Sequence, residues 1–237
     1  MASLTDTFNI FFWGTFGFFI FKYIVNGKQW FWSIIYIMVA IMLMYFVNMA
    51  VFQDKCGFSD AWIVFKATFL PWVLIFGMMV TTINIYPGWK SPFSNTLGYM
   101  FALLSPSTTE LKNHVNPGRE LDMVRTDPLL FINQINMSNI DDIESRIDEM
   151  KIFNISTPES KKIVVDLIQN LVFMKEIISE WVWFMLTGFV TISTSYNLLA
   201  NETCRTSVEQ QSQDYNKSVV EEDTDIVAPS RVYYVDE

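Results

Sequence analysis

The sequence predicts an all-α protein whose helices cross a membrane about four times, with a small, mainly helical extramembrane region and a flexible acidic C-terminal tail. Three observations indicate this class. Charged residues make up only 17% of the chain and hydrophobic residues 51%, whereas a soluble domain carries about 25% charged residues. The charges are uneven, since residues 61–99 hold only Lys66 and Lys90, while the last 37 residues hold nine acids. Several uncharged stretches reach the roughly 20 residues that a helix needs to cross a bilayer.

Three of these stretches are strong candidates for spanning helices. They are uncharged over 21 to 23 residues and carry tryptophans where the aromatic belt of a membrane lies: residues 30–52, 67–89 and 181–201.

A fourth candidate, residues 7–21, has 15 uncharged positions, so Lys22 must extend its amine to the headgroups if the helix continues to Val25. A helix lying flat in the interface is the alternative, but such a helix has a polar face. This stretch is apolar nearly all round, which favours a span.

The spans divide the chain into four regions. Residues 1–104 contain three spans and an interfacial elbow, 105–170 form the extramembrane region, 171–200 form the fourth span, and 201–237 form the tail. The tail is polar and acidic, which is typical of an extended or disordered segment. Its β-prone end, with Tyr233 and Tyr234, could add to the sheet edge of a partner, or it could be a frayed terminus.

The lysines beside the short loops predict the orientation. Lys22, Lys28, Lys90 and the lysines that precede the fourth span fall on one side if the spans alternate, and this side is predicted to be cytoplasmic. Cys56 and Cys204 then lie together on the other side, where a disulfide could join them. Two unrelated free thiols are the alternative.

Residues 87–99 are rich in proline, glycine and aromatic residues. Two prolines and two glycines argue against a continuous helix here. We expect the chain to bend at the interface and to lay a short helix, over residues 97–104, along it. Trp89, Phe93 and Tyr99 suit such a headgroup-level elbow.

A long helix is predicted from Pro158 to Ala200. Thr157 is a helix-capping residue with proline directly after it, and no helix breaker follows before the fourth span. The first half of this helix, outside the membrane, offers an apolar stripe to a neighbouring helix at residues 138–150, capped by Ser138, or to a partner protein. The stripe includes Ile163, Leu167, Leu171 and Met174, at helical spacing.

The sequence shows no constellation of an enzyme site, and we expect no enzymatic activity, cofactor or metal. His114 is the only histidine, which leaves little for a His-based metal site or a catalytic triad. The net charge of −9 argues against nucleic-acid binding, which needs clustered lysine and arginine. Lys66, Asn48, Asn84 and Asn197 are the polar side chains that could line a path across the membrane.

Residues 87–99, read with the apolar run 72–86 before them, resemble a motif in inner-membrane structural proteins of large icosahedral double-stranded DNA viruses of the chlorella-virus type. The resembling string is Gly-Trp-Lys-Ser-Pro-Phe-Ser-Asn-Thr-Leu-Gly-Tyr. The resemblance covers about a tenth of the chain. It implies a membrane-associated minor capsid protein that resides in host endomembrane before assembly and in the internal membrane of the virion afterwards.

Two functions from different classes therefore remain. The first is a structural protein that anchors the internal membrane to the capsid shell, with the lipid bilayer, capsid or other membrane proteins and further copies of itself as partners. The second is a subunit of a small oligomeric channel or transporter, or a membrane assembly factor outside the virion. A channel needs a polar path between facing spans, whereas an anchor needs specific contacts in residues 105–180 or the tail.

Overall fold

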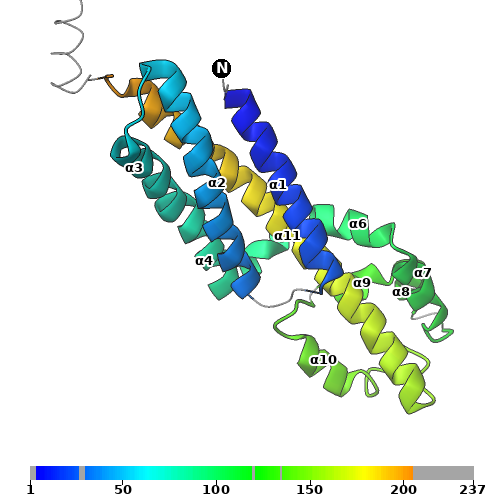
Figure 1. Cartoon of the computed structure of the whole chain (residues 1–237). Helices are drawn as coiled ribbons and strands as arrows, with labels where there is room; N and C mark the ends of the chain where they lie inside the picture. The colour runs from blue at the N-terminus through cyan, green and yellow to red at the C-terminus, as the bar shows by residue number, and fades with distance from the viewer. Residues whose placement is uncertain (1–3, 27–29, 119–120, 134, 205–237) are drawn as a thin grey trace, which may run out of the picture. The chain divides into compact units, whose positions relative to one another are not determined.

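The computed structural model describes residues 4–26, 30–118, 121–133 and 135–204. The regular secondary structure in these ranges is helical (Figure 1), apart from an isolated bridge between Val115 and Phe153. The chain divides into two units, Met1–Ala200 and Asn201–Glu237, and the helices lie in the first unit except for the last residue of the longest one. The all-α prediction is confirmed for these residues, and most of the tail lies outside them.

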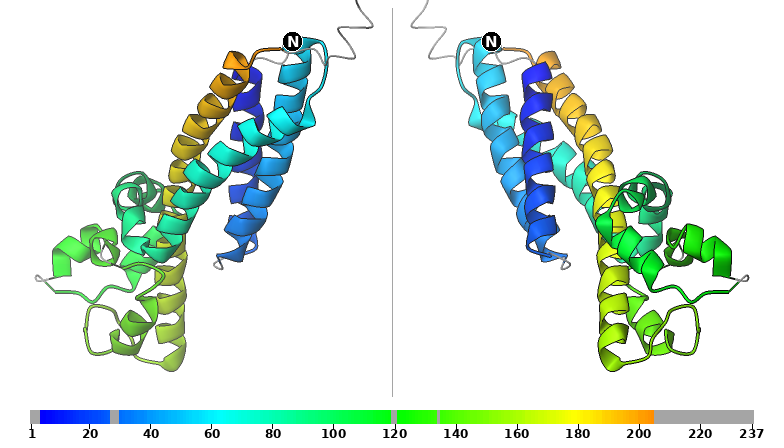
Figure 2. Two further views of the ribbon diagram at one scale, coloured as in Figure 1. Left: turned by 90° about the vertical axis from the view of Figure 1, so that its left-hand side faces the viewer. Right: turned by 90° about the vertical axis from the view of Figure 1, so that its right-hand side faces the viewer.

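Four helices are long and apolar enough to cross a membrane. They are α1 (Leu4–Ile24), α2 (Phe31–Cys56), the composite helix over Ala61–Ile85, and α11 (Pro158–Asn201). Successive members of this set run in opposite directions, so the start of α1 and the end of α11 lie at the same end of the bundle (Figures 1 and 2). All four predicted spans, including the first, thus correspond to helices of sufficient length and apolarity. The third was predicted at residues 67–89 but runs from Ala61 to Ile85, so it includes Lys66 and ends before the bend at Tyr86.

The composite helix contains a local change of winding. It consists of α3 (Ala61–Pro71), the π-helical segment η1 (Trp72–Gly77) and α4 (Met78–Ile85). Pro71 has no backbone donor and its ring clashes with the preceding turn, and a π-helical turn is a common way for a helix to absorb such a disturbance. The helix therefore continues past the proline.

The elbow differs in part from its prediction. The chain bends at Tyr86 (φ −118°, ψ 82°), as expected, but the next 17 residues are helical throughout. They form η2 (Pro87–Lys90), α5 (Ser91–Phe93), η3 (Ser94–Gly98) and α6 (Tyr99–Leu103). The expectation of an interrupted helix was wrong because both prolines stand at the starts of segments, where their missing donors are not needed.

The extramembrane region packs four short helices against the first half of α11. These are α7 (Pro106–Asn113), α8 (Asp122–Thr126), α9 (Leu129–Ile132) and α10 (Ile140–Arg146). The helix predicted at 138–150 is shorter than expected and begins after Asn139, without a side-chain cap. Ser138 donates instead to the side-chain oxygen of Asn136, so the predicted Ser138 cap was wrong.

Helix α11 belongs to both hydrophobic cores. It has 44 residues, about 66 Å at 1.5 Å per residue, and Thr157 caps it by accepting from the Ser160 amide at 3.1 Å. Its Val164–Val172 portion lies in the extramembrane core with Leu129 and Ile132. Further along, Phe184 and Ile192 lie in the core of the bundle. The predicted long helix is confirmed.

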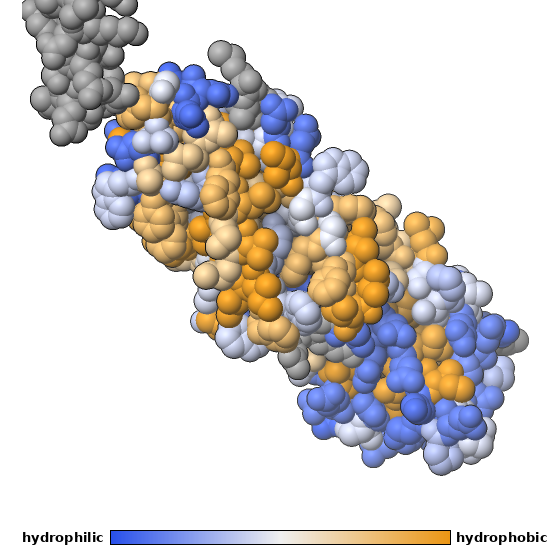
Figure 3. Space-filling view, viewed as in Figure 1, coloured by the Kyte–Doolittle hydropathy of each residue, from blue (hydrophilic) through white to orange (hydrophobic). Residues whose placement is uncertain are grey.

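The outer surface of the bundle is apolar. Trp13, Met38 and Met42 are each 65% exposed, and such side chains cover α1 and α2 in Figure 3, whereas hydrophilic side chains gather on the extramembrane helices. Only about a fifth of the most apolar window of α1 and of α2 is buried (22% in each). A surface of this kind matches the hydrocarbon of a bilayer.

Candidate functional site

Five polar side chains meet where the bundle joins the extramembrane region, and we call them the charge cluster: Lys22, Ser33, Lys90, Glu176 and Glu180. Each comes from a helix end or from one face of α11. Lys22 lies in the last turn of α1, and Ser33 in the first turn of α2. Glu176 and Glu180 are four residues apart on α11, so they lie on one face. The bend at Tyr86 turns Lys90 back toward this face.

The inner half of the cluster is a closed ion pair. The Lys22 amine donates to both Glu180 carboxylate oxygens, at 2.7 and 2.8 Å, and the Ser33 hydroxyl donates to one of them at 2.8 Å. The Lys22 and Glu180 side chains are each only 5% exposed. The Lys22 amine, which was expected to extend to lipid headgroups, pairs with Glu180 inside the protein.

The outer half of the cluster is looser. The Lys90 amine lies 3.4 Å from a Glu176 oxygen and 4.0 Å from a Glu180 oxygen. The other Glu176 oxygen accepts from the Met137 amide at 2.6 Å. The cluster thereby connects α1, α2, α11, the elbow and the loop before α10.

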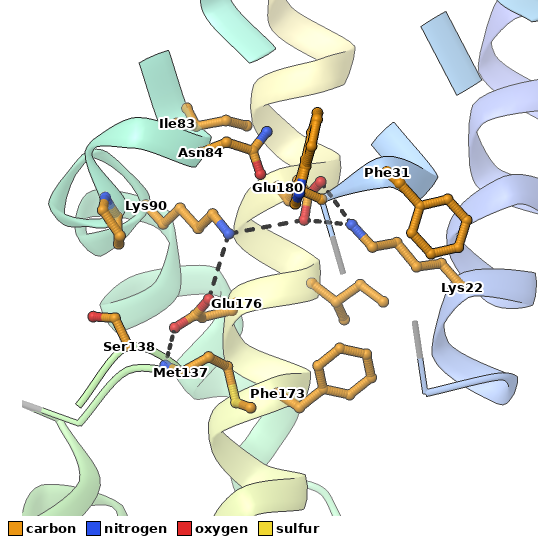
Figure 4. Close-up of a pocket in the computed structure, with 13 residues that line it drawn as sticks. Lys22, Phe31, Ile83, Asn84, Lys90, Met137, Ser138, Phe173, Glu176 and Glu180 are labelled. Atoms are coloured by element: carbon orange, nitrogen blue, oxygen red, sulfur yellow. Dashed lines mark hydrogen bonds and ion pairs between the residues drawn. The ribbon is translucent and has the colours of Figure 1, made fainter. Parts of the chain in front are cut away.

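A cavity of about 380 Å³ lies against these side chains. Figure 4 shows Lys22 and Lys90 reaching toward Glu180 from opposite sides, with Glu176 below them. Asn84, Trp30 and Phe31 also line the cavity. It has a mixed lining, with two ammonium groups, two carboxylates and several apolar side chains.

The elbow is attached to α11 by its backbone. The Ser179 hydroxyl donates to the Lys90 carbonyl at 2.6 Å, and the Trp183 indole donates to the Trp89 carbonyl at 2.9 Å. At Gly98 an added Cβ would lie 2.6 Å from the Lys175 carbonyl oxygen, so only glycine permits this close approach of η3 to α11.

The three residues predicted for the elbow make different contacts. The Trp89 ring is half exposed, as a headgroup-level side chain would be, while Phe93 packs edge-on against Trp183 at 5.0 Å between ring centroids. Tyr99 packs against the extramembrane core and its hydroxyl donates to Asp127.

The apolar stripe on α11 is covered by the chain itself. Leu167 and Leu171 are buried in the extramembrane core, and Met174 is partly buried against it. Ile163 stays exposed. Of the two expected occupants, the neighbouring helices of the same chain fill most of the stripe. Tyr233 and Tyr234, the other proposed contact residues, lie outside the described residues.

A second polar site connects three spans nearer the opposite end of the bundle. The Asn48 amide donates to the Thr68 and Ser195 hydroxyls, at 2.8 Å each, and Ser195 donates to the Ala67 carbonyl at 2.7 Å. The Asn48 amide nitrogen therefore makes both of its hydrogen bonds within the bundle. Asn197 and Lys66 are exposed on its outer surface.

Between the two polar sites the bundle is filled with aromatic rings. Phe11, Trp72, Phe76 and Phe184 are each at most 2% exposed, and successive ring centroids lie 4.9 to 5.8 Å apart. We call these four residues the aromatic layer. It separates the charge cluster from the site around Asn48.

Cys56 and Cys204 are both disulfide-bonded, and no free cysteine occurs within the described ranges, so the alternative of two free thiols does not hold. Their pairing with each other stays a prediction that a non-reducing peptide map tests. Among the described residues there is no group of histidine, cysteine and carboxylate side chains that could hold a metal ion.

Sequence reasoning missed the charge cluster. Glu176 and Glu180 directly precede the uncharged stretch 181–201, and nothing in the sequence indicates a partner for either. A signal was present, because charged residues at the ends of otherwise uncharged spans are costly unless they are paired. The partners could not be assigned, since Lys22 and Glu180 are 158 residues apart in the chain.

Comparison with known proteins gives no relative. No family model matches the chain, and neither a curated protein nor a solved structure matches it.

Proposed function

We propose that this chain is a structural membrane protein that holds a protein assembly against a lipid bilayer. The observation that carries the proposal is the sharing of α11 between two cores. One helix runs through the apolar bundle and through the extramembrane core, and the charge cluster holds it at the junction. A force on the extramembrane helices is thereby transmitted to the bundle through a continuous helix, without a flexible linker.

The assembly that the chain contacts is proposed to be the capsid of a virus with an internal membrane. The resemblance of residues 87–99 to inner-membrane proteins of large icosahedral double-stranded DNA viruses supports this identity. The structure also supports the anchoring role, because residues 87–99 form the elbow that attaches the extramembrane helices to α11. The other partners would be lipid and, through the apolar outer faces, further copies of the chain.

The channel alternative has less support from the geometry. Asn48 makes hydrogen bonds inside the bundle, while Lys66 and Asn197 are on the outer surface. The aromatic layer packs four buried rings closely together inside a single bundle, which argues against a continuous hydrated path through it. A channel would therefore have to form between copies.

Quantitative mass spectrometry of purified virus particles tests the proposal. Particles are compared before and after protease shaving and after detergent extraction. A fixed ratio of the chain to the major shell protein, resistance to shaving and partial loss in detergent are expected. If the chain is absent from particles and confined to host membranes, the proposal is wrong and the assembly-factor or channel function replaces it.

A further inference from the structure

The cavity beside the charge cluster lies at one end of the spans. It is lined by Lys22 near the end of α1, by Phe31 at the start of α2, and by Asn84 near the end of α4. Because these three ends border the apolar bundle, the cavity falls at the headgroup level of the adjoining leaflet if the chain crosses a bilayer, as proposed above. A ligand that enters here is therefore a lipid headgroup.

The two halves of the charge cluster differ in their capacity for a ligand. Glu180 accepts three short hydrogen bonds from Lys22 and Ser33, which closes the inner half. The Lys90 amine has three donors but its carboxylate contacts are at 3.4 and 4.0 Å. An ammonium at these distances can still donate short hydrogen bonds to an anionic oxygen.

Two acceptors face the cavity near Lys90. One is the Glu176 oxygen on the Lys90 side, whose contact with that amine is the long one. The other is the side-chain oxygen of Asn84, whose amide nitrogen donates to the Val80 carbonyl at 2.7 Å. Figure 4 shows the Asn84 oxygen directed toward the cavity, and no described residue donates to it.

We infer that this cavity binds the headgroup of a phospholipid that carries a primary ammonium and no net charge, which is the chemistry of phosphatidylethanolamine. Lys90 donates to the phosphate, while Glu176 and Asn84 accept from the ammonium. The two lysines and two glutamates of the lining balance, so a net-neutral headgroup enters without leaving an excess charge. A quaternary ammonium has no N–H donor and cannot satisfy these acceptors.

Native mass spectrometry of the full-length chain in detergent tests the site. The chain is mixed with equal amounts of phosphatidylethanolamine, phosphatidylcholine and phosphatidylglycerol that have identical acyl chains. We expect about tenfold greater retention of the ethanolamine lipid, the ratio that corresponds to one charge-assisted hydrogen bond. Equal retention of the three lipids, or a preference for the choline or glycerol lipid, would overturn the inference.

Three variants localise the binding. Lys90→Met, Glu176→Gln and Asn84→Leu are each expected to reduce ethanolamine-lipid retention toward that of the choline lipid. Asn84→Leu removes only one helix-backbone bond, so it is the variant that best keeps the fold. Lys162→Met, at an exposed lysine in the second turn of α11, is the matched control and should bind as the unchanged chain does. An undiminished preference in Asn84→Leu and Glu176→Gln would place the lipid elsewhere.

Soluble phosphoethanolamine identifies the source of the headgroup. It is expected to leave the lipid adduct intact at equal concentration, because it lacks the acyl chains that the apolar surface of the bundle contacts. If it displaces the lipid, the membrane source is wrong. This readout is independent of the proposed anchoring role, which particle composition tests, so either idea can fail alone.

Discussion

The Lys22–Glu180 pair shows how much depends on single side chains in this molecule. Both are almost completely buried, and Glu180 is the acceptor for two helices at once through Lys22 and Ser33. Removing Lys22 would leave the buried Glu180 carboxylate with the Ser33 hydroxyl and the Lys90 amine at 4.0 Å, and breaking a buried ion pair costs about 3–5 kcal/mol. We therefore expect the loss of either residue to lower the stability of the fold markedly.

Lys22→Met is expected to lower the free energy of unfolding by about 3–5 kcal/mol, measured by detergent-denaturant titration. The double variant Lys22→Met with Glu180→Gln should lose less than the sum of the two single losses, because the second change removes the stranded charge. Lys66→Met is the control: its amine is exposed and lies 5.6 Å from the Trp62 ring centroid, so less than about 1 kcal/mol should be lost. Strict additivity in the double variant would contradict the pairing.

A second prediction for a single residue concerns Gly188. A Cβ added there would lie 2.0 Å from an atom of the Phe11 ring, which is buried and packs edge-on against the rings of Trp72 and Phe76. Gly188→Ala should therefore destabilise the bundle by about 1–3 kcal/mol, the usual effect of overpacking. Gly14→Ala has nothing within 4 Å of its added carbon and should unfold at nearly the same denaturant concentration as the unchanged chain. Equal effects of the two substitutions would mean that α1 and α11 do not pack as described.

At the scale of helices, polar contacts fix which spans are neighbours. In a membrane the apolar faces of helices gain little from each other over lipid, so close packing and interhelical hydrogen bonds determine their arrangement. Asn48 on α2 reaches both Thr68 on α3 and Ser195 on α11. This one residue connects three of the four spans.

Asn48→Leu is expected to weaken the bundle by about 0.6–1.7 kcal/mol, the range for hydrogen bonds between helices in membranes. Asn197→Leu is a matched control of the same residue type, since Asn197 is exposed on the outer surface of α11. Both variants are compared by thermal unfolding in the same detergent. A larger loss in Asn197→Leu would show that the outer surface of α11 is an interface.

For the whole molecule, the alternation of the helices predicts a topology. The turn between α2 and α3, which contains Ser59, and the start of α11, which contains Lys162, lie at opposite ends of the helical unit (Figure 1). In a chain with both native cysteines changed to serine, Ser59→Cys and Lys162→Cys should be labelled by a membrane-impermeant maleimide from opposite faces of sealed vesicles. Labelling of both from one face would remove one crossing.

The parts of the fold that are local in sequence could be predicted, and the parts that join distant residues could not. The four apolar helices and the long α11 follow from uncharged runs, helix spacing and the Thr157–Pro158 start, each contained within a short stretch. The elbow was predicted incompletely because a proline count does not reveal that each proline begins a new turn. The charge cluster depends on how the spans are arranged, which no short stretch specifies. For the same reason, Asn48 was identified as polar and intramembrane but not as bonded to Ser195.

Lys22 and Glu180 are far apart in the sequence, so their ion pair can form only late in synthesis. The ribosome makes the lysine 158 residues before the glutamate, which at about 5–20 residues per second is a delay of roughly 8–32 s. During this interval the Lys22 amine has no Glu180 carboxylate to pair with. The synthesis of α11 then supplies this carboxylate. We therefore expect α1 to take its final place in the bundle only after α11 has been made.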